Sequence, residues 1–146
     1  MSVTATTPGS IVLLTRLARR VYREATDGVL GMTLKQFVVL NHLSENAGVP
    51  QRQLGDVLCL DANNLVLLLN EIERAGWAER RRDPTDRRRH LVYRTHAGSS
   101  ALAAAERGMD AVEDRILDTL STQERATLRF LLAAALTEET ALSDRK

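Results

Sequence analysis

The sequence predicts a mostly α-helical protein that contains one β-hairpin. Hydrophobic residues make up 44% of its 146 residues but aromatic residues only 3%, so the core must consist mainly of Leu, Val, Ile and Ala. Leu and Ala favour helices, and apolar residues recur at helical spacing along most of the chain. The spacing changes around residues 77–94, where a turn sequence separates two short segments. We therefore expect about six helices and one hairpin.

The first helix is expected to begin at Ser10, a suitable N-cap residue, and to end near the glycines at 28–31. The sequence Thr33-Leu-Lys-Gln36 then has the form of a capping box, in which each side chain bonds the backbone N–H group of the other residue. It predicts a second helix that runs to about Glu45.

A short helix is expected next, from about Pro50 to Leu58, because Pro is tolerated in a first turn. Asp61 is a suitable N-cap for the following helix, which Gly76 terminates. One stripe of that helix is apolar at helical spacing and is predicted to be buried: Leu65, Leu68, Leu69 and Ile72.

The hairpin is predicted from two strands, residues 77–82 and 90–94, that are joined by the turn sequence Asp83-Pro-Thr-Asp86. Residues 80–94 include seven Arg and two Asp, a net charge of +5, whereas residues 101–146 carry −3. The overall charge of +1 hides this separation. A basic patch of this kind suits an anionic partner.

Two more helices are expected after the hairpin. Ser121-Thr-Gln-Glu124 is a second capping box and opens the last of them. The helix before it, over about 97–120, carries a narrow apolar seam of the sort that packs on another helix: Leu102, Ala105, Met109, Val112, Ile116 and Leu120.

Two helices joined by a tight turn and followed by a basic hairpin are the order of elements in a winged helix-turn-helix. In that fold the second helix enters the major groove of DNA, and the hairpin can reach the adjoining minor groove. We therefore expect a DNA-binding domain at 32–96. The helices at 10–31 and 97–142 have more apolar surface than this domain needs, so they are expected to form a dimerisation region with a second copy. Residues 1–9 are expected to be a flexible tail.

The sequence also resembles the MarR family of bacterial transcription regulators from about residue 10 to 140. The resemblance is carried by MTLKQFVVLNHL at 32–43, QLGDVLCLDANNLVLLLNEIERAGWAERR at 53–81 and DPTDRRRHLVYRTHAG at 83–98. It implies that the wing motif of the family, Asp-x-Arg, falls on Asp86 and Arg88, where the Asp holds the Arg for the minor groove.

This sequence differs from the family pattern in two places. Arg94 stands where the family usually has an apolar residue, and Val66 and Leu67 stand where the recognition helix often has polar residues. Asn can bond an adenine edge, whereas Val and Leu could contact only a thymine methyl. The arginines at 80–82 and 87–89 form the basic cluster. The residues predicted to bind DNA are Arg52, Ala62, Asn63, Asn64, Asn70, Arg81, Arg82, Asp86, Arg87, Arg88 and Arg89.

The resulting expectation is a homodimeric repressor that binds a near-palindromic DNA operator. The resemblance further implies release by a small aromatic or phenolic effector. A pocket for that effector is predicted at Leu14, Leu17, Tyr22, Phe37, His42 and Met109. The alternative is a winged helix that binds protein rather than DNA, which the apolar Val66 and Leu67 keep open.

Other functions are not expected. The chain lacks a Ser/His/Asp set, a phosphate-binding glycine loop and paired carboxylates, so no enzyme activity is predicted. Its three His and one Cys are not at metal-ligand spacing, so no metal or cofactor is predicted. The lone Cys59 is expected to be a small buried residue in a reducing compartment. No leader segment or membrane span of about 20 apolar residues is seen, so a cytoplasmic protein without membrane contact is expected.

Overall fold

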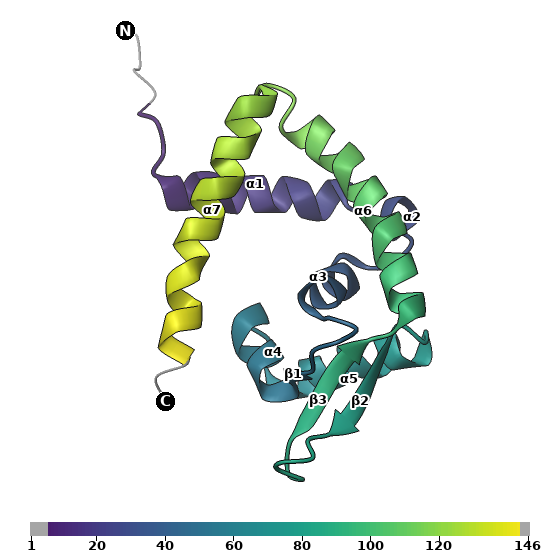
Figure 1. Cartoon of the computed structure of the whole chain (residues 1–146). Helices are drawn as coiled ribbons and strands as arrows, with labels where there is room; N and C mark the ends of the chain where they lie inside the picture. Colours follow the sequence, from purple (N-terminus) through teal and green to yellow (C-terminus); the bar gives the residue numbers. More distant parts are fainter. Residues whose placement is uncertain (1–5, 144–146) are drawn as a thin grey trace, which may run out of the picture.

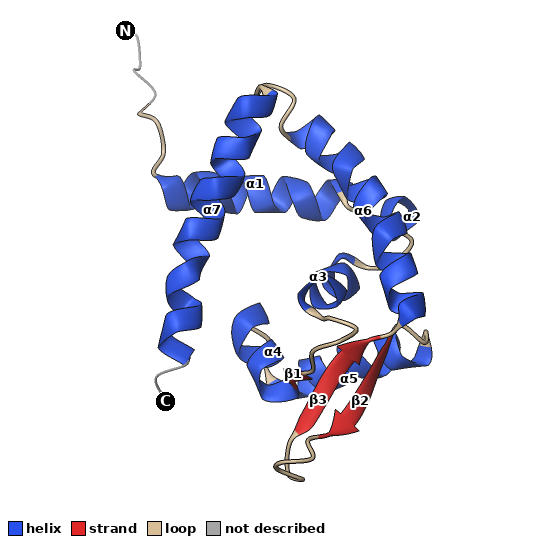
Figure 2. Ribbon diagram, viewed as in Figure 1, coloured by secondary structure: helices blue, strands red, loops and turns tan. Residues whose placement is uncertain are grey.

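The computed structural model describes the backbone of residues 6–143 and the side chains of residues 6–137. The first five residues of the expected tail therefore lie outside the described part. The mostly helical fold with a hairpin is confirmed (Figures 1 and 2). The helices are α1 (Ser10–Glu24), α2 (Asp27–Leu30), α3 (Leu34–His42), α4 (Gln51–Leu58), α5 (Ala62–Arg74), α6 (His96–Ile116) and α7 (Thr122–Ser143). The strands are β1 (Val49–Pro50), β2 (Ala78–Arg82) and β3 (His90–Arg94).

The sheet contains one strand that the sequence did not predict. Its order is β1-β3-β2, and both pairs are antiparallel. The hairpin strands β2 and β3 pair as expected, whereas β1 adds two residues at the edge, with Val49 opposite Val92. Pro50 is tolerated there because an edge strand does not need every N–H group for pairing. In Figure 1 the hairpin projects at the end of the molecule opposite the α6–α7 connection.

Side-chain caps determine where several helices begin. Thr33 and Gln36 form the predicted capping box, and Ser121 and Glu124 form the second one. Asp61 caps α5 as expected, since its carboxylate accepts from the backbone N–H of Asn64. The N-cap prediction for the first helix is wrong: Gly9 holds that position, without any side-chain hydrogen bond.

The core joins the winged part of the chain to α6. Its largest fully buried side chains come from α3, α4, α5, α6 and β3: Val39, Leu40, Leu54, Leu69, Ile72, Val92 and Val112. The apolar seam of α6 packs on α1, α2 and α3 of the same chain, so its partner helices are internal. The central module and the long helix therefore share one hydrophobic core.

Two glycines allow α6 to approach its neighbours closely. A β-carbon at Gly98 would overlap the carbonyl oxygen of Trp77, and one at Gly108 would overlap the carbonyl oxygen of Val29. Thr95 fixes the first approach, because its hydroxyl donates to the Gly76 carbonyl at 2.6 Å and accepts from the Gly98 N–H at 3.0 Å. These contacts set the angle at which α6 leaves the hairpin.

The prediction that Cys59 is buried is wrong. Cys59 is exposed and has a left-handed backbone with φ of 54° at the end of α4. The tight turn into α5 needs this conformation, and in it the side chain faces solvent. A non-glycine residue with positive φ is uncommon, and sequence periodicity does not indicate it.

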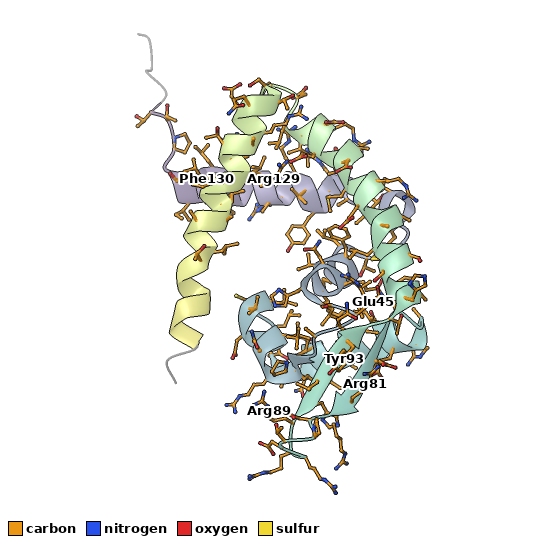
Figure 3. All side chains as sticks on the ribbon, in the orientation of Figure 1. Glu45, Arg81, Arg89, Tyr93, Arg129 and Phe130 are labelled. Atoms are coloured by element: carbon orange, nitrogen blue, oxygen red, sulfur yellow. The ribbon has the colours of Figure 1, made fainter. Side chains whose placement is uncertain are left out.

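The helices α1 and α7 leave most of their large apolar side chains exposed. α1 contains no buried residue, and Ile11 is 74% exposed. On α7, Phe130, which is labelled in Figure 3, is 72% exposed, and Leu131 is 58% exposed. Contiguous exposed apolar surface of this kind marks an interaction site in soluble proteins.

None of the helices described between residues 6 and 143 combines the length and apolarity that crossing a membrane requires.

Candidate nucleic-acid interface

The helix α5 has one buried face and one exposed face. Its predicted leucine and isoleucine stripe is buried against α3 and α4. The opposite face is exposed and consists of Ala62, Asn63, Asn64, Val66 and Leu67. This outward face is available to a partner along the first two turns of the helix.

Two of the three asparagines predicted to read bases are engaged within the chain. The Asn64 side chain donates from Nδ2 to Oδ2 of Asp61 at 2.7 Å. The side-chain oxygen Oδ1 of Asn70 accepts a hydrogen bond from Nη2 of Arg80 at 2.6 Å. Among the described residues, only Asn63 has an amide side chain on this face that makes no hydrogen bond.

The turn between β2 and β3 is organised by a buried carboxylate. Asp83 is only 7% exposed, and its Oδ1 accepts from the hydroxyl of Thr85 at 2.7 Å and from its N–H at 2.9 Å. These hydrogen bonds hold the pKa of Asp83 below its ordinary value. The Asp83 N–H also donates to the Arg89 carbonyl, which closes the hairpin. The sequence indicated a turn here but not this role for Asp83.

Asp86 organises the tip of the hairpin. Its carboxylate accepts from the backbone N–H of Arg88 at 3.1 Å and lies 3.6 Å from Nε of the same residue. Its backbone carbonyl accepts from the N–H of Arg89. The Arg88 side chain is 95% exposed, so the carboxylate orients the guanidinium without covering it.

The six arginines of the basic cluster are of two kinds. Arg80 points inward, bonded to Glu73 and Asn70, and its hydrogen bond holds the pKa of Glu73 below the ordinary value. Arg81 pairs with Glu79 and lies 4.4 Å above the ring centroid of Tyr93 (Figure 3). Arg82 and Arg87 have no ion-pair partner among the described residues, and Arg88 and Arg89 have only loose ones at 3.6 and 3.7 Å.

The hairpin tip and the start of α5 border one surface hollow. Ala62 and Val66 line it from α5, Arg52 from α4, and Arg88 and Arg89 from the tip. Five of the eleven predicted DNA-binding residues therefore border one hollow, with Asp86 as the fifth. The polar groups of three predicted residues, Asn64, Asn70 and Arg81, already have partners within the chain.

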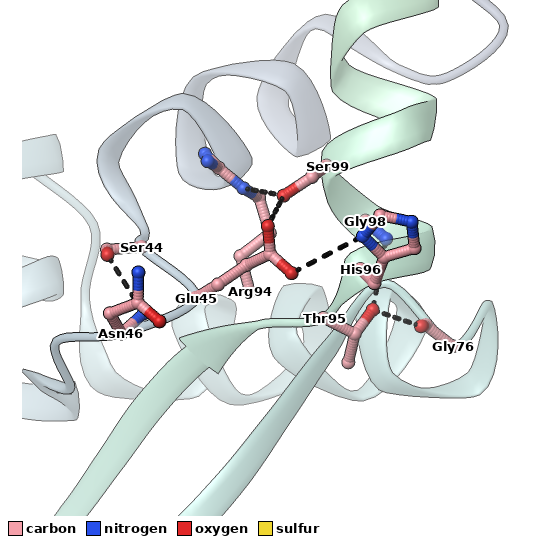
Figure 4. Close-up of polar contacts among 9 residues, drawn as sticks. All are labelled: Ser44, Glu45, Asn46, Gly76, Arg94, Thr95, His96, Gly98 and Ser99. Atoms are coloured by element: carbon pink, nitrogen blue, oxygen red, sulfur yellow. Dashed lines mark hydrogen bonds and ion pairs between the residues drawn. The ribbon is translucent and has the colours of Figure 1, made fainter.

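Arg94 connects the hairpin to two helices. Its Nη1 donates to the carbonyl oxygens of Leu40 and Leu43 at 2.9 and 2.8 Å, and its Nε donates to Oγ of Ser99. Ser99 donates in turn to Glu45 (Figure 4). A cation at the C-terminus of α3 also complements the helix dipole. This explains how a charged residue stands where the related pattern is apolar.

A separate cavity of about 590 Å³ is bordered by α1, α3, α6 and α7. Three residues of the predicted effector pocket line it: Leu17, Phe37 and Met109. The other three do not. Leu14 and Tyr22 are exposed on α1, and His42 borders the hollow beside α4 instead.

An exposed helix after a tight turn, with a basic hairpin beside it, is the arrangement that winged helix-turn-helix proteins use. By its fold the chain is a protein of that class. The sequence profile of the MarR family matches residues 30–89. The multiple antibiotic resistance protein MarR of Escherichia coli K12 is 31% identical over 109 residues, 73% of this chain and 75% of that protein.

Two further comparisons agree. A Thauera aromatica protein that is named as a transcriptional regulatory protein for the hcr operon is 32% identical over 124 residues, 85% of this chain and 72% of that protein. The crystal structure of an Escherichia coli MarR mutant complexed with operator DNA matches with a TM-score of 0.70 at 26% identity, covering 86% of this chain and 91% of the other. The chain belongs to the MarR family.

Proposed function

We propose that the chain is a homodimeric transcription regulator that binds double-stranded DNA, with α5 in the major groove and the hairpin in the minor groove. The observation that carries the proposal is the group of exposed arginines beside the exposed face of α5. Phosphate neutralisation by such arginines supplies affinity and releases counterions. The relative solved with operator DNA supports the same reading.

The exposed apolar faces of α1 and α7 support the homodimer. Leu13 and Leu14 on α1, and Leu131 and Leu136 on α7, are each at least 42% exposed. A second copy would bury these faces against each other. A two-fold dimer would place two α5 helices about 34–36 Å apart, one turn of DNA, which predicts a near-palindromic operator. The molar mass in solution, measured by light scattering, tests the dimer directly.

The cavity beside α7 supports regulation of DNA binding by a small molecule. We propose repression as the output. Arg125 is paired with Asp114 and Arg129 with Glu113, but Glu106 and Asp110 have no ion-pair partner among the described residues. These carboxylates favour a neutral or cationic aromatic molecule over a phenolic anion. A coupling free energy of about 1–3 kcal/mol between the two sites is typical of such regulation.

The test is a gel-shift titration against the DNA upstream of the gene for this chain, at about 50 and 200 mM salt. A dimer that makes about 6–10 phosphate contacts loses roughly 10³–10⁵ in affinity between these two salt concentrations. Arg88→Ala is expected to weaken binding on the order of tenfold and to flatten the salt dependence. Arg107→Ala is the matched control, because Arg107 is exposed on α6 beside Gly108, which packs on α2.

Two outcomes contradict the proposal. If Arg88→Ala and Arg107→Ala bind alike, the assignment of the hairpin is wrong. If no duplex is retarded at either salt concentration, the chain is a protein-interaction module, which is the alternative function.

A further inference from the structure

The outward face of α5 is mainly apolar at its centre. Asn63, Val66 and Leu67 are spaced as i, i+3 and i+4 and therefore lie side by side on the helix surface. Leu67 is 62% exposed and Val66 38%. Burying the exposed parts of branched apolar side chains is favourable, so this face is suited to an apolar contact.

The polar groups around this patch are mostly engaged. The amide of Asn64 bonds Asp61, and the oxygen of Asn70 bonds Arg80. Asn63 is thus the one amide on the face that is free among the described residues. This surface therefore offers a partner the hydrogen bonds of one amide and the apolar contacts of two branched side chains.

The surroundings of the patch favour duplex DNA as its partner. Val66 borders the same hollow as Arg52, Arg88 and Arg89, so cations lie beside the Val66 edge of the apolar surface. An apolar patch with arginines along one edge matches a groove whose walls are phosphates and whose floor presents methyl groups. In the major groove the only apolar group is the C5-methyl of thymine, and the adenine edge is the one that an amide bonds twice.

We propose that Val66 and Leu67 recognise thymine C5-methyl groups in the major groove, next to an adenine bonded by Asn63. This inference rests on the proposed function. It identifies the specificity-determining residues and predicts that each half-site contains A·T pairs whose thymine methyls face α5. Arginines at the tip would contribute affinity, and the two apolar side chains would contribute sequence preference.

Replacing thymine by uracil tests the proposal, because uracil lacks only the methyl group and keeps the same hydrogen-bonding edge. Duplexes that bind the full chain are first selected from a random-sequence library. Each thymine of a selected half-site is then replaced in turn by deoxyuridine, and affinity is measured by fluorescence anisotropy. Wild type is expected to bind about fourfold more weakly for each contacted methyl that is lost, the factor expected for one buried methyl-sized group.

Variants assign the effect to α5. In Val66→Ala and Leu67→Ala, the thymine-to-uracil affinity ratio should fall to about one at the position that each side chain contacts. Both side chains are exposed, so helicity measured by circular dichroism should be unchanged. Arg88→Ala is the matched control: it should weaken binding to both duplexes equally and leave the ratio at its wild-type value.

The outcomes separate this inference from the proposed function. If duplexes are selected and bound but no uracil substitution changes affinity, or if Val66→Ala and Leu67→Ala keep the wild-type ratio, methyl recognition by α5 is wrong and DNA binding stands. If no duplex is selected, the proposed function itself fails.

Discussion

Helices α5 and α7 are both rich in leucine, yet they place most of these side chains in opposite environments. In α5 the stripe from Leu65 to Ile72 is buried inside the chain. In α7, Phe130 (Figure 3) and Leu131 are both exposed to solvent. The difference teaches that apolar periodicity indicates that a helix face will be covered but does not identify what covers it.

The largest expected effect comes from truncating one leucine on each helix. Leu69→Ala should lower the free energy of unfolding by about 2–5 kcal/mol, because Leu69 is fully buried and a cavity remains. Leu131→Ala should instead weaken the dimer and change the stability of the monomer by less than about 0.5 kcal/mol. Urea unfolding at two protein concentrations, together with light scattering, distinguishes the two effects.

A concentration-dependent loss in Leu131→Ala and a concentration-independent loss in Leu69→Ala would confirm the comparison. If Leu131→Ala lowered stability as much as Leu69→Ala at every concentration, α7 would have to pack within its own chain, and the dimer proposed through it would lose its main support.

Arg94 and Arg88 differ as α5 and α7 do: Arg94 is engaged within the chain, whereas Arg88 is exposed. A second prediction tests this difference. Arg94→Met should lower the free energy of unfolding by about 2 kcal/mol, because two carbonyl oxygens at the end of α3 lose a charged donor. Arg88→Met, at a side chain that is 95% exposed, should change it by less than about 0.5 kcal/mol. DNA affinity should fall more in Arg88→Met than in Arg94→Met, since only Arg88 points at the proposed ligand. Equal destabilisation by both substitutions would contradict this division.

Local sequence signals predicted most of the fold. The capping boxes at Thr33 and Ser121, the cap at Asp61 and the turn after Asp83 each depend on residues within four positions of one another. All the interacting groups lie within about one turn of the chain, so the sequence alone predicts these features. The order of these elements was then enough to predict the winged arrangement and the basic hairpin.

Features that depend on distant partners were not predictable in this way. Arg94 bonds residues more than fifty positions away, and the two-residue strand β1 exists only because β3 passes beside it. Asn70 was expected to bind DNA, but its side-chain oxygen accepts a hydrogen bond from Arg80. The left-handed backbone at Cys59 likewise follows from the geometry of the α4–α5 turn, which composition does not encode.

The smallest expected effect concerns the link between α5 and β2. Ionised Glu73 accepts two hydrogen bonds from Arg80, at 2.8 and 3.1 Å, and this lowers its pKa in the folded chain. Its contribution to stability is therefore present above the ordinary Glu pKa of about 4.3 and is lost as the pH falls through the lower folded value. Glu73→Gln should cost less than about 1 kcal/mol near neutral pH, and the cost should shrink on acidification.

Urea unfolding of wild type and Glu73→Gln from neutral pH to about pH 3 measures this difference across the range in which the group titrates. The background variant Arg80→Met supplies the control, because without the guanidinium Glu73→Gln should show no pH-dependent cost. A difference that grew on acidification, or that persisted in the Arg80→Met background, would mean that Glu73 is held by something other than Arg80. The link between α5 and β2 would then depend on the hydrogen bond between Asn70 and Arg80 and on packing, and not on the Glu73–Arg80 ion pair.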